Sequence, residues 1–331
     1  MLDEGPYAYA KACGIIGKSF VGKRINILFS VKTLADLARL IFRKETDSPV
    51  SDLEDSIEKR SVQQILSIVN CFEKPPDIIV RQLRAYEYTD LKTCLHHIAK
   101  GETIPDIYCL GRFRTVHFKA FPNLKAMLSG TEFEFLHPKE MQTDKIDFSN
   151  VETRLDVHYY NELRNSLCEL SGEDRALVQR ILNDEISLNN CIWALRLRTY
   201  YNKNSAETIK HLTHASEAKD ALTLPLDSRS PWQLWKWEKF LNPEHPGEHW
   251  FFDPRYFQNA ASLYLYRLAL FGFHRIPMSV SSIFCFIKIK QFEEDLLTSI
   301  AEGLSFGLDS SEVFKLLDIL SSVEQSRRLF S

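Results

Sequence analysis

Apolar residues recur at helical spacing along most of this chain. Between residues 27 and 41 they fall at every third or fourth position, which is the stripe of an amphipathic helix. The same spacing predicts helices near 7–12, 52–72, 78–99, 171–198, 253–268, 292–304 and 310–323. Three stretches, 104–118, 131–135 and 279–289, are also compatible with strand because short apolar runs have no decisive period. The predicted fold class is therefore all-α, and one β-hairpin is also compatible with the pattern.

Composition narrows the class of protein further. Of the 331 residues, 44% are apolar and 26% are charged, which excludes a disordered chain. The 12 glycines are about half of the usual share of ~7%, which argues against glycine-rich phosphate loops and many-turned β-sandwiches. A formal net charge of −3 is too balanced for a protein that neutralises duplex phosphates, so we expect no nucleic-acid partner.

Cysteine spacing and the length of apolar runs indicate the cellular compartment of the protein. The seven cysteines are odd in number and never spaced as C-x-x-C, which predicts reduced thiols buried as small apolar side chains in a cytosol-facing protein. Residues 1–6 lack the apolar core of a signal peptide. No uncharged apolar run reaches ~18 residues, so we expect no transmembrane segment and at most a peripheral membrane position.

The chain is long enough for about two domains of ~150 residues, or for three small ones. Segments rich in proline, aspartate and serine at 43–51, 136–151 and 224–232 are candidate linkers. A weak repeat also occurs three times, with Glu87 before Asp90, Glu185 before Asn189, and Glu293 before Asp295. Copies at about one third of the chain length suit three helical units. We place them near 1–135, 136–225 and 226–331, with boundaries that can interleave in sequence.

One short motif looks like the end of a phosphate-binding loop, Gly14-Ile-Ile-Gly17-Lys18-Ser19. Such a loop needs four residues between its glycines so that successive N–H groups wrap the phosphates, and here there are two. Ala12 stands where the first glycine belongs, and the preceding residues read as helix rather than strand. We therefore interpret the motif as a flexible segment between two helices.

Histidine pairs are the other candidates for chemistry. His245 and His249 lie four residues apart beside Glu248, as in zinc hydrolases, but Pro246 and Gly247 break the helix that would present both rings on one face. The pairs His211/His214 and His96/His97 lack a third ligand, and surface or capping histidines are the better interpretation. The chain also has no G-x-S-x-G elbow. We predict no catalytic residue, no metal ligand and no cofactor.

Four of the five tryptophans, Trp232, Trp235, Trp237 and Trp250, cluster within 19 residues. Stacking on single-stranded bases would also require a basic groove, and this interval is roughly balanced in charge. Core packing between two helices is the favoured interpretation, and a partner interface is the alternative because tryptophan is enriched at binding hot spots.

Several segments resemble one family of proteins, the C subunit of prokaryotic V/A-type ATPases, which includes the eukaryotic V-ATPase d (AC39) subunit. The similar segments are YAYAKACGIIGKSF at 7–20, YEYTDLK at 86–92, NNCIWALRLRTYY at 189–201, FIKIKQFEEDL at 286–296 and IAEG at 300–303. These are helix surfaces rather than a catalytic signature. Their order and spacing cover essentially the whole chain.

The resemblance implies a nearly all-helical funnel of three similar domains with a central cavity. It implies a non-catalytic rotor subunit on the cytoplasmic face of the membrane, which receives the central shaft in its cavity and rests on the proteolipid ring. Such a torque coupler needs stiff, packed helices and neither cofactor nor nucleophile. Two other classes stay open: a helical scaffold or adaptor, and a metal-dependent hydrolase that uses His245 and His249.

Overall fold

The computed structural model describes residues 4–43, 49–136 and 148–317. Within these ranges the chain forms helices, 3-10 turns and irregular loops without a β-strand, which confirms the all-α prediction. The α-helices are α1 (Glu4–Ile16), α2 (Leu34–Phe42), α3 (Val50–Val69), α4 (Asp77–Leu83), α5 (Ala85–Lys100), α6 (Leu124–Leu128), α7 (Phe148–Ser166), α8 (Gly172–Tyr201), α9 (Ser205–Ile209), α10 (Lys219–Thr223), α11 (Pro254–Arg275), α12 (Val280–Ser305) and α13 (Ser310–Leu316). The 3-10 helices are η1 (Gly22–Ser30), η2 (Gly111–Phe113), η3 (Phe118–Ala120), η5 (Leu167–Glu169), η6 (Ala215–Ala218), η7 (Ser230–Trp232) and η8 (Glu238–Phe240).

Side-chain caps set several helix boundaries. The side chains of Thr33, Asp253 and Ser279 accept backbone N–H groups in the first turns of α2, α11 and α12. A reciprocal cap between Asp309 and Glu312 begins α13. Ser171, in contrast, precedes α8 without a side-chain cap bond.

The structure corrects three predicted elements. The single helix expected over 27–41 is wrong, because the chain leaves η1 at Val31 in an extended conformation and restarts at α2. The helix expected over 78–99 is divided at Arg84 into α4 and α5. Gly14 lies inside α1 rather than in a flexible segment. Of the helix expected over 310–323, residues beyond 317 lie outside the described ranges.

The three ambiguous stretches resolve in different ways. Residues 279–289 begin α12, the helix with the most buried residues. Residues 104–118 are irregular apart from η2 and the first residue of η3, and residues 131–135 form turns. Parts of two candidate linkers, 44–48 and 137–147, lie outside the described residues.

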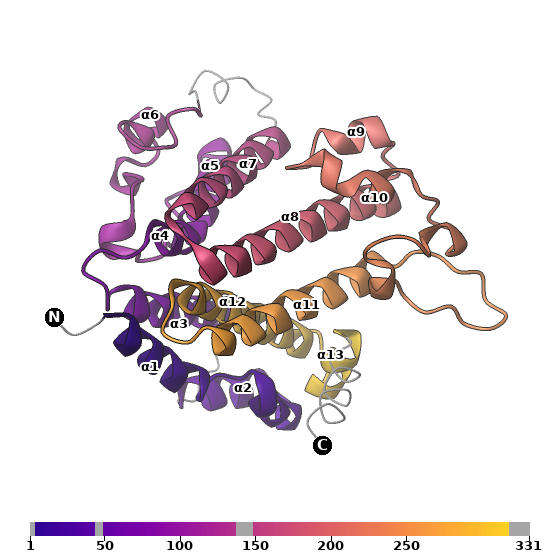
Figure 1. Cartoon of the computed structure of the whole chain (residues 1–331), viewed down its shortest axis with the longest axis horizontal. Coiled ribbons are helices and arrows are strands. Elements are labelled where there is room, and N and C mark those ends of the chain that lie inside the picture. Colours follow the sequence, from indigo (N-terminus) through magenta and orange to yellow (C-terminus); the bar gives the residue numbers. More distant parts are fainter. Residues whose placement is uncertain (1–3, 44–48, 137–147, 318–331) are drawn as a thin grey trace.

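Buried apolar side chains gather in three clusters. The largest joins α1, α2, α3, α12 and α13, in the lower part of Figure 1, to α4 and to the ends of α7, α8 and α11. A second joins α5, the loops around α6, and α7 at the upper left. A third joins the second half of α8, the tryptophan-rich segment and the first half of α11 at the right. These clusters draw on segments far apart in sequence. The division at 1–135, 136–225 and 226–331 stays a prediction.

A similar polar contact recurs on three helices. Glu87 of α5 accepts the N–H groups of Thr115 and Val116 at 2.6 and 2.7 Å. Asn190 of α8 accepts the N–H of His214 at 3.0 Å, and Glu293 of α12 accepts that of Phe20 at 2.7 Å. All three acceptors are almost fully buried. Glu87, Asn190 and Glu293 follow one another at equal intervals in the sequence, although Glu185 and Asn189 rather than Asn190 were the residues of the predicted repeat.

Candidate functional site

Two adjoining pockets of about 360 and 340 Å³ form a hollow between α3, α8, α11 and α12. Both pockets are lined by Gln258, Ser262, Phe292 and Asp295. We call this space the inter-helix hollow. Its walls are long helices that pack directly on one another, so its shape is set by the core and not by loops.

Trp193 is the main exposed aromatic side chain of the hollow. It projects from α8 with 51% of its surface exposed, unlike the other four tryptophans. The guanidinium of Arg196 lies 5.6 Å from its ring centroid and donates to Gln258 of α11 at 3.4 Å. Exposed tryptophan and arginine side chains beside a concave surface are the residue types that dominate binding energy at protein interfaces.

Carboxylates give the hollow a negative character. Glu58, Glu294, Asp295 and Glu302 line one pocket, and Glu185 lines the other, where Lys288 pairs with it at 2.7 Å. Asp295 is exposed, and partial desolvation by the surrounding protein raises its pKa above its ordinary value, although Lys288 opposes the shift. Burial also raises the pKa of Glu294 to about 7. A cationic partner would favour ionisation of both groups.

Two tyrosines hold the acidic rim in place. The hydroxyl of Tyr86 donates to Glu294 at 2.7 Å, and the hydroxyl of Tyr108 donates to Glu58. Their rings meet edge to face at 5.2 Å. Because α5 and the following loop supply the tyrosines while α3 and α12 supply the acids, these contacts fix the cluster around α5 to the wall of the hollow.

The phosphate-loop-like motif has a structural role. Ser19 is fully buried, its hydroxyl donates to the carbonyl of Ile15 at 3.1 Å, and it accepts from the ammonium of Lys290. Lys290 is itself buried and pairs with Glu293. Burial alone would raise the pKa of Glu293, but Lys290 and the Phe20 N–H outweigh it and lower that pKa. This network ties the chain after α1 to α12.

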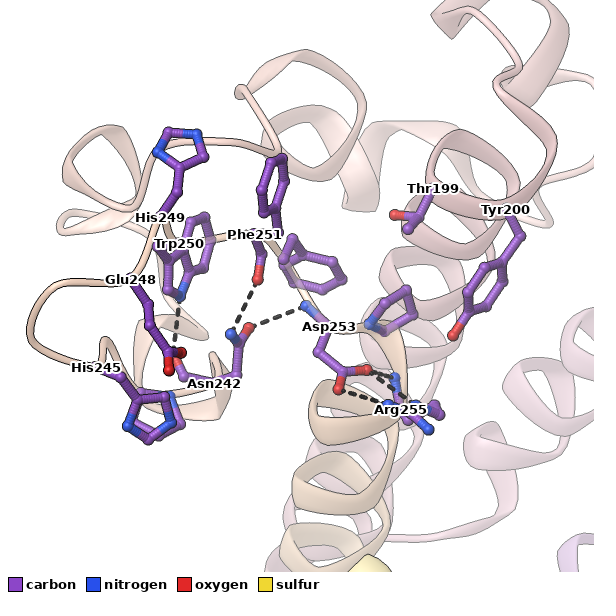
Figure 2. Close-up of a pocket in the computed structure, with 13 residues that line it drawn as sticks. Thr199, Tyr200, Asn242, His245, Glu248, His249, Trp250, Phe251, Asp253 and Arg255 are labelled. Atoms are coloured by element: carbon purple, nitrogen blue, oxygen red, sulfur yellow. Dashed lines mark hydrogen bonds and ion pairs between the residues drawn. The ribbon is translucent and has the colours of Figure 1, made fainter.

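His245 and His249 line a separate pocket of about 540 Å³. Figure 2 shows their rings at opposite ends of the loop, pointing away from one another, with the ring of His249 near Phe251. Asn242 organises the loop: its amide donates to the carbonyl of Phe251 and its oxygen accepts the N–H of Asp253. The structure therefore does not bring the two histidines together as a ligand pair.

The other two histidine pairs make structural contacts. His96 pairs with Glu152 at 2.7 Å, and His97 contacts the carbonyl of Thr103 at 2.8 Å. His211 contacts Ser149 at 2.7 Å, and the backbone N–H of His214 is bound by Asn190. Across residues 4–43, 49–136 and 148–317, no three histidine, cysteine, aspartate or glutamate side chains lie close enough together to hold a metal ion.

Cysteine burial differs from the expectation. All seven cysteines are free thiols, but only Cys94, Cys191 and Cys285 are buried. Burial raises the pKa of each of these three thiols to about 12, which keeps them protonated and unreactive. Cys13, Cys109 and Cys168 are exposed, so their prediction as buried side chains is wrong.

The clustered tryptophans form part of the core, as predicted. Trp232, Trp235, Trp237 and Trp250 are each at most 8% exposed. Their indole N–H groups find partners in three cases, for example Trp232 with the carbonyl of Pro225 at 2.7 Å. The fifth, Trp193, was not singled out from the sequence. The sequence feature that could have identified Trp193 is its position on the polar side of a helix, away from the apolar stripe.

Comparison with known proteins gives the family. The family model described as "ATP synthase (C/AC39) subunit" matches residues 17–315. A protein of Treponema pallidum (strain Nichols), described only as an uncharacterized protein, is 27% identical over 318 residues, which span 91% of this chain and 92% of that protein. None of the helices described is both long and apolar enough to cross a bilayer. With nearly its whole length matched, this chain belongs to the ATP synthase C/AC39 subunit family.

Proposed function

We propose that this protein is the non-catalytic central-stalk subunit of a V/A-type ATPase, which couples the central shaft to the membrane proteolipid ring. The observation that carries the proposal is the inter-helix hollow in a chain of the C/AC39 family. The hollow receives the tip of the shaft, and the opposite surface rests on the ring at the cytoplasmic face of the membrane. The complex would use the coupling for ion transport or ATP synthesis.

The packing of the molecule supports a torque-bearing role. Torque requires that one unit does not rotate against the next, and buried polar contacts with fixed geometry resist such rotation better than apolar contacts alone. Glu87, Asn190 and Glu293 each hold a returning segment against a long helix. This threefold recurrence supports three equivalent helical units arranged around the hollow.

The acidic character of the hollow supports a cationic contact surface on the shaft. Glu294 and Asp295 both have raised pKa values, and a lysine or arginine that enters the hollow would favour their ionised forms. Trp193 would supply the apolar centre of the contact, with Arg196 beside it. The proposal thus assigns apolar burial to α8 and charge complementarity to α12.

Co-purification tests the function. Tagged protein isolated from its own membranes with a mild detergent is expected to carry the ATPase head subunits and the proteolipid. Chemical cross-linking should join the hollow-lining face of α8 to a shaft subunit. Recovery of the tagged chain with other proteins and without any ATPase subunit would favour a scaffold or adaptor. Stoichiometric zinc in the purified protein would favour the hydrolase alternative.

A further inference from the structure

Positive charge is concentrated in one segment of the chain. Residues 5–35 contain no acidic side chain, although the whole chain has 44 acidic against 41 basic residues. Four cations in and around η1 are exposed, Lys18, Lys23, Arg24 and Lys32, and we call them the basic strip. Ile27, with 38% of its surface exposed, lies among them in sequence.

The segment that carries the basic strip is held firmly against the core. Its apolar side chains point inward, with Ile25, Leu28 and Val31 at most 6% exposed. The backbone is fixed by bonds from the N–H of Phe20 to Glu293 at 2.7 Å and from the N–H of Gly22 to the hydroxyl of Tyr266 at 3.0 Å. The cations are therefore presented on an ordered surface.

Nearby acids do not neutralise the basic strip. Glu293, the buried acid beside Phe20, already pairs with Lys290 and lies 3.7 Å from Arg60, so the surroundings add positive charge. The start of α13 approaches through a bond from Ser310 to the carbonyl of Val31, and its acids Asp309 and Glu312 cap each other's backbone. Among the ion pairs between described residues, the strip cations have no acidic partner; Arg24 lies 5.8 Å from the ring of Phe20.

The chemistry of the strip favours a diffuse anionic surface. Three of the four cations are lysines, which act as flexible point charges, whereas recognition of one acidic group usually employs the bidentate fork of arginine. Lysines interspersed with an exposed apolar residue suit a layer of acidic headgroups, which attracts each cation without a fixed geometry. We propose that the basic strip binds anionic lipid headgroups. The choice of a membrane as the source of the anions rests on the proposed function.

Vesicle sedimentation of the full-length chain alone tests the inference. We expect binding to phosphatidylcholine vesicles that contain phosphatidylglycerol, weak binding to phosphatidylcholine alone, and loss of binding as salt rises. The variant K18E/K23E is expected to reduce the affinity by about tenfold or more. The control K210E/K239E makes the same charge change at two exposed lysines that have Glu207 and Glu238 close in sequence, and should lower affinity by less than about threefold.

The outcomes separate this inference from the proposed function. Equal binding to neutral vesicles, no binding to anionic vesicles, or equal losses in K18E/K23E and the control would overturn the lipid assignment. So would binding of the strip to isolated proteolipid ring but not to protein-free anionic vesicles. Should the glutamate pair unfold the chain, K18Q/K23Q gives the same comparison with a smaller expected loss. If the chain binds anionic vesicles but never co-purifies with ATPase subunits, the proposed central-stalk function is wrong and the lipid-binding inference is supported.

Discussion

Glu293 accepts the backbone N–H of Phe20 at 2.7 Å, and this bond joins residues 273 positions apart. It places the segment after α1 against α12, near the other end of the described chain. The carboxylate is buried with Lys290, and the same ammonium reaches Ser19. A single buried ion pair thereby joins an early and a late segment of the chain within the largest apolar cluster.

Removing the charge of Glu293 should be costly. In Glu293→Gln the amide oxygen can still accept from Phe20, but Lys290 loses its counter-charge in a buried site. We expect the free energy of unfolding to fall by about 3–5 kcal/mol, measured by urea titration. The double variant K290M/E293Q removes both charges and should be less destabilised than the single variant. If the loss of unfolding free energy in the double variant equals the sum of the losses in Glu293→Gln and Lys290→Met, the two residues are not a coupled pair.

Two glycines should respond to alanine in opposite directions. A Cβ at Gly303 would lie 2.3 Å from Cγ2 of the buried Val313, so Gly303→Ala should displace α13 and cost about 1–3 kcal/mol. A Cβ at Gly14, within α1, meets no atom within 4 Å, so Gly14→Ala should stabilise by about 0.5 kcal/mol through helix propensity. The midpoints of thermal unfolding of both variants, compared with that of the native protein, test this prediction. Equal shifts of the two midpoints would contradict the packing at Val313.

The protonation of Glu294 predicts a pH-dependent stability difference. Its pKa of about 7 in the folded protein is above its ordinary value, so its contribution is fully present at low pH and is lost as pH rises through 7. Glu294→Gln cannot ionise. Its stability relative to the native protein should therefore increase by about 1–2 kcal/mol between pH 5 and pH 8. The exposed Glu244→Gln serves as the control, and an increase of equal size there would refute the assignment.

Trp193→Ala tests the inter-helix hollow as the shaft site. Truncating an exposed interface tryptophan should lower affinity for purified shaft subunits by about tenfold or more, measured by calorimetry, with little change in thermal midpoint. Tyr201→Ala is the matched control, since Tyr201 is 69% exposed on the same helix and does not line the hollow. If Trp193→Ala binds the shaft subunits with unchanged affinity, the α8 side of the hollow is not part of the contact.

The spacing of apolar residues predicted most of the helices. The stripe at 52–72 corresponds to α3 and the one at 253–268 to α11, because this signal is local in sequence. The break after Val31 could not be predicted in the same way, since it follows from Glu293, Tyr266 and Ser310, which hold the η1 segment from distant elements. For the same reason, Asn190 was passed over in favour of Glu185 and Asn189.

The sequence by itself determined that this protein is helical, since the spacing of apolar residues fixes which face of each helix leaves water. It also determined the family, through helix surfaces spread over nearly the whole chain. Only the tertiary structure decided that Trp193 faces a hollow, and that His245 and His249 point apart. Exposure and the direction of a side chain depend on which helices meet, and those contacts join residues that no local pattern relates.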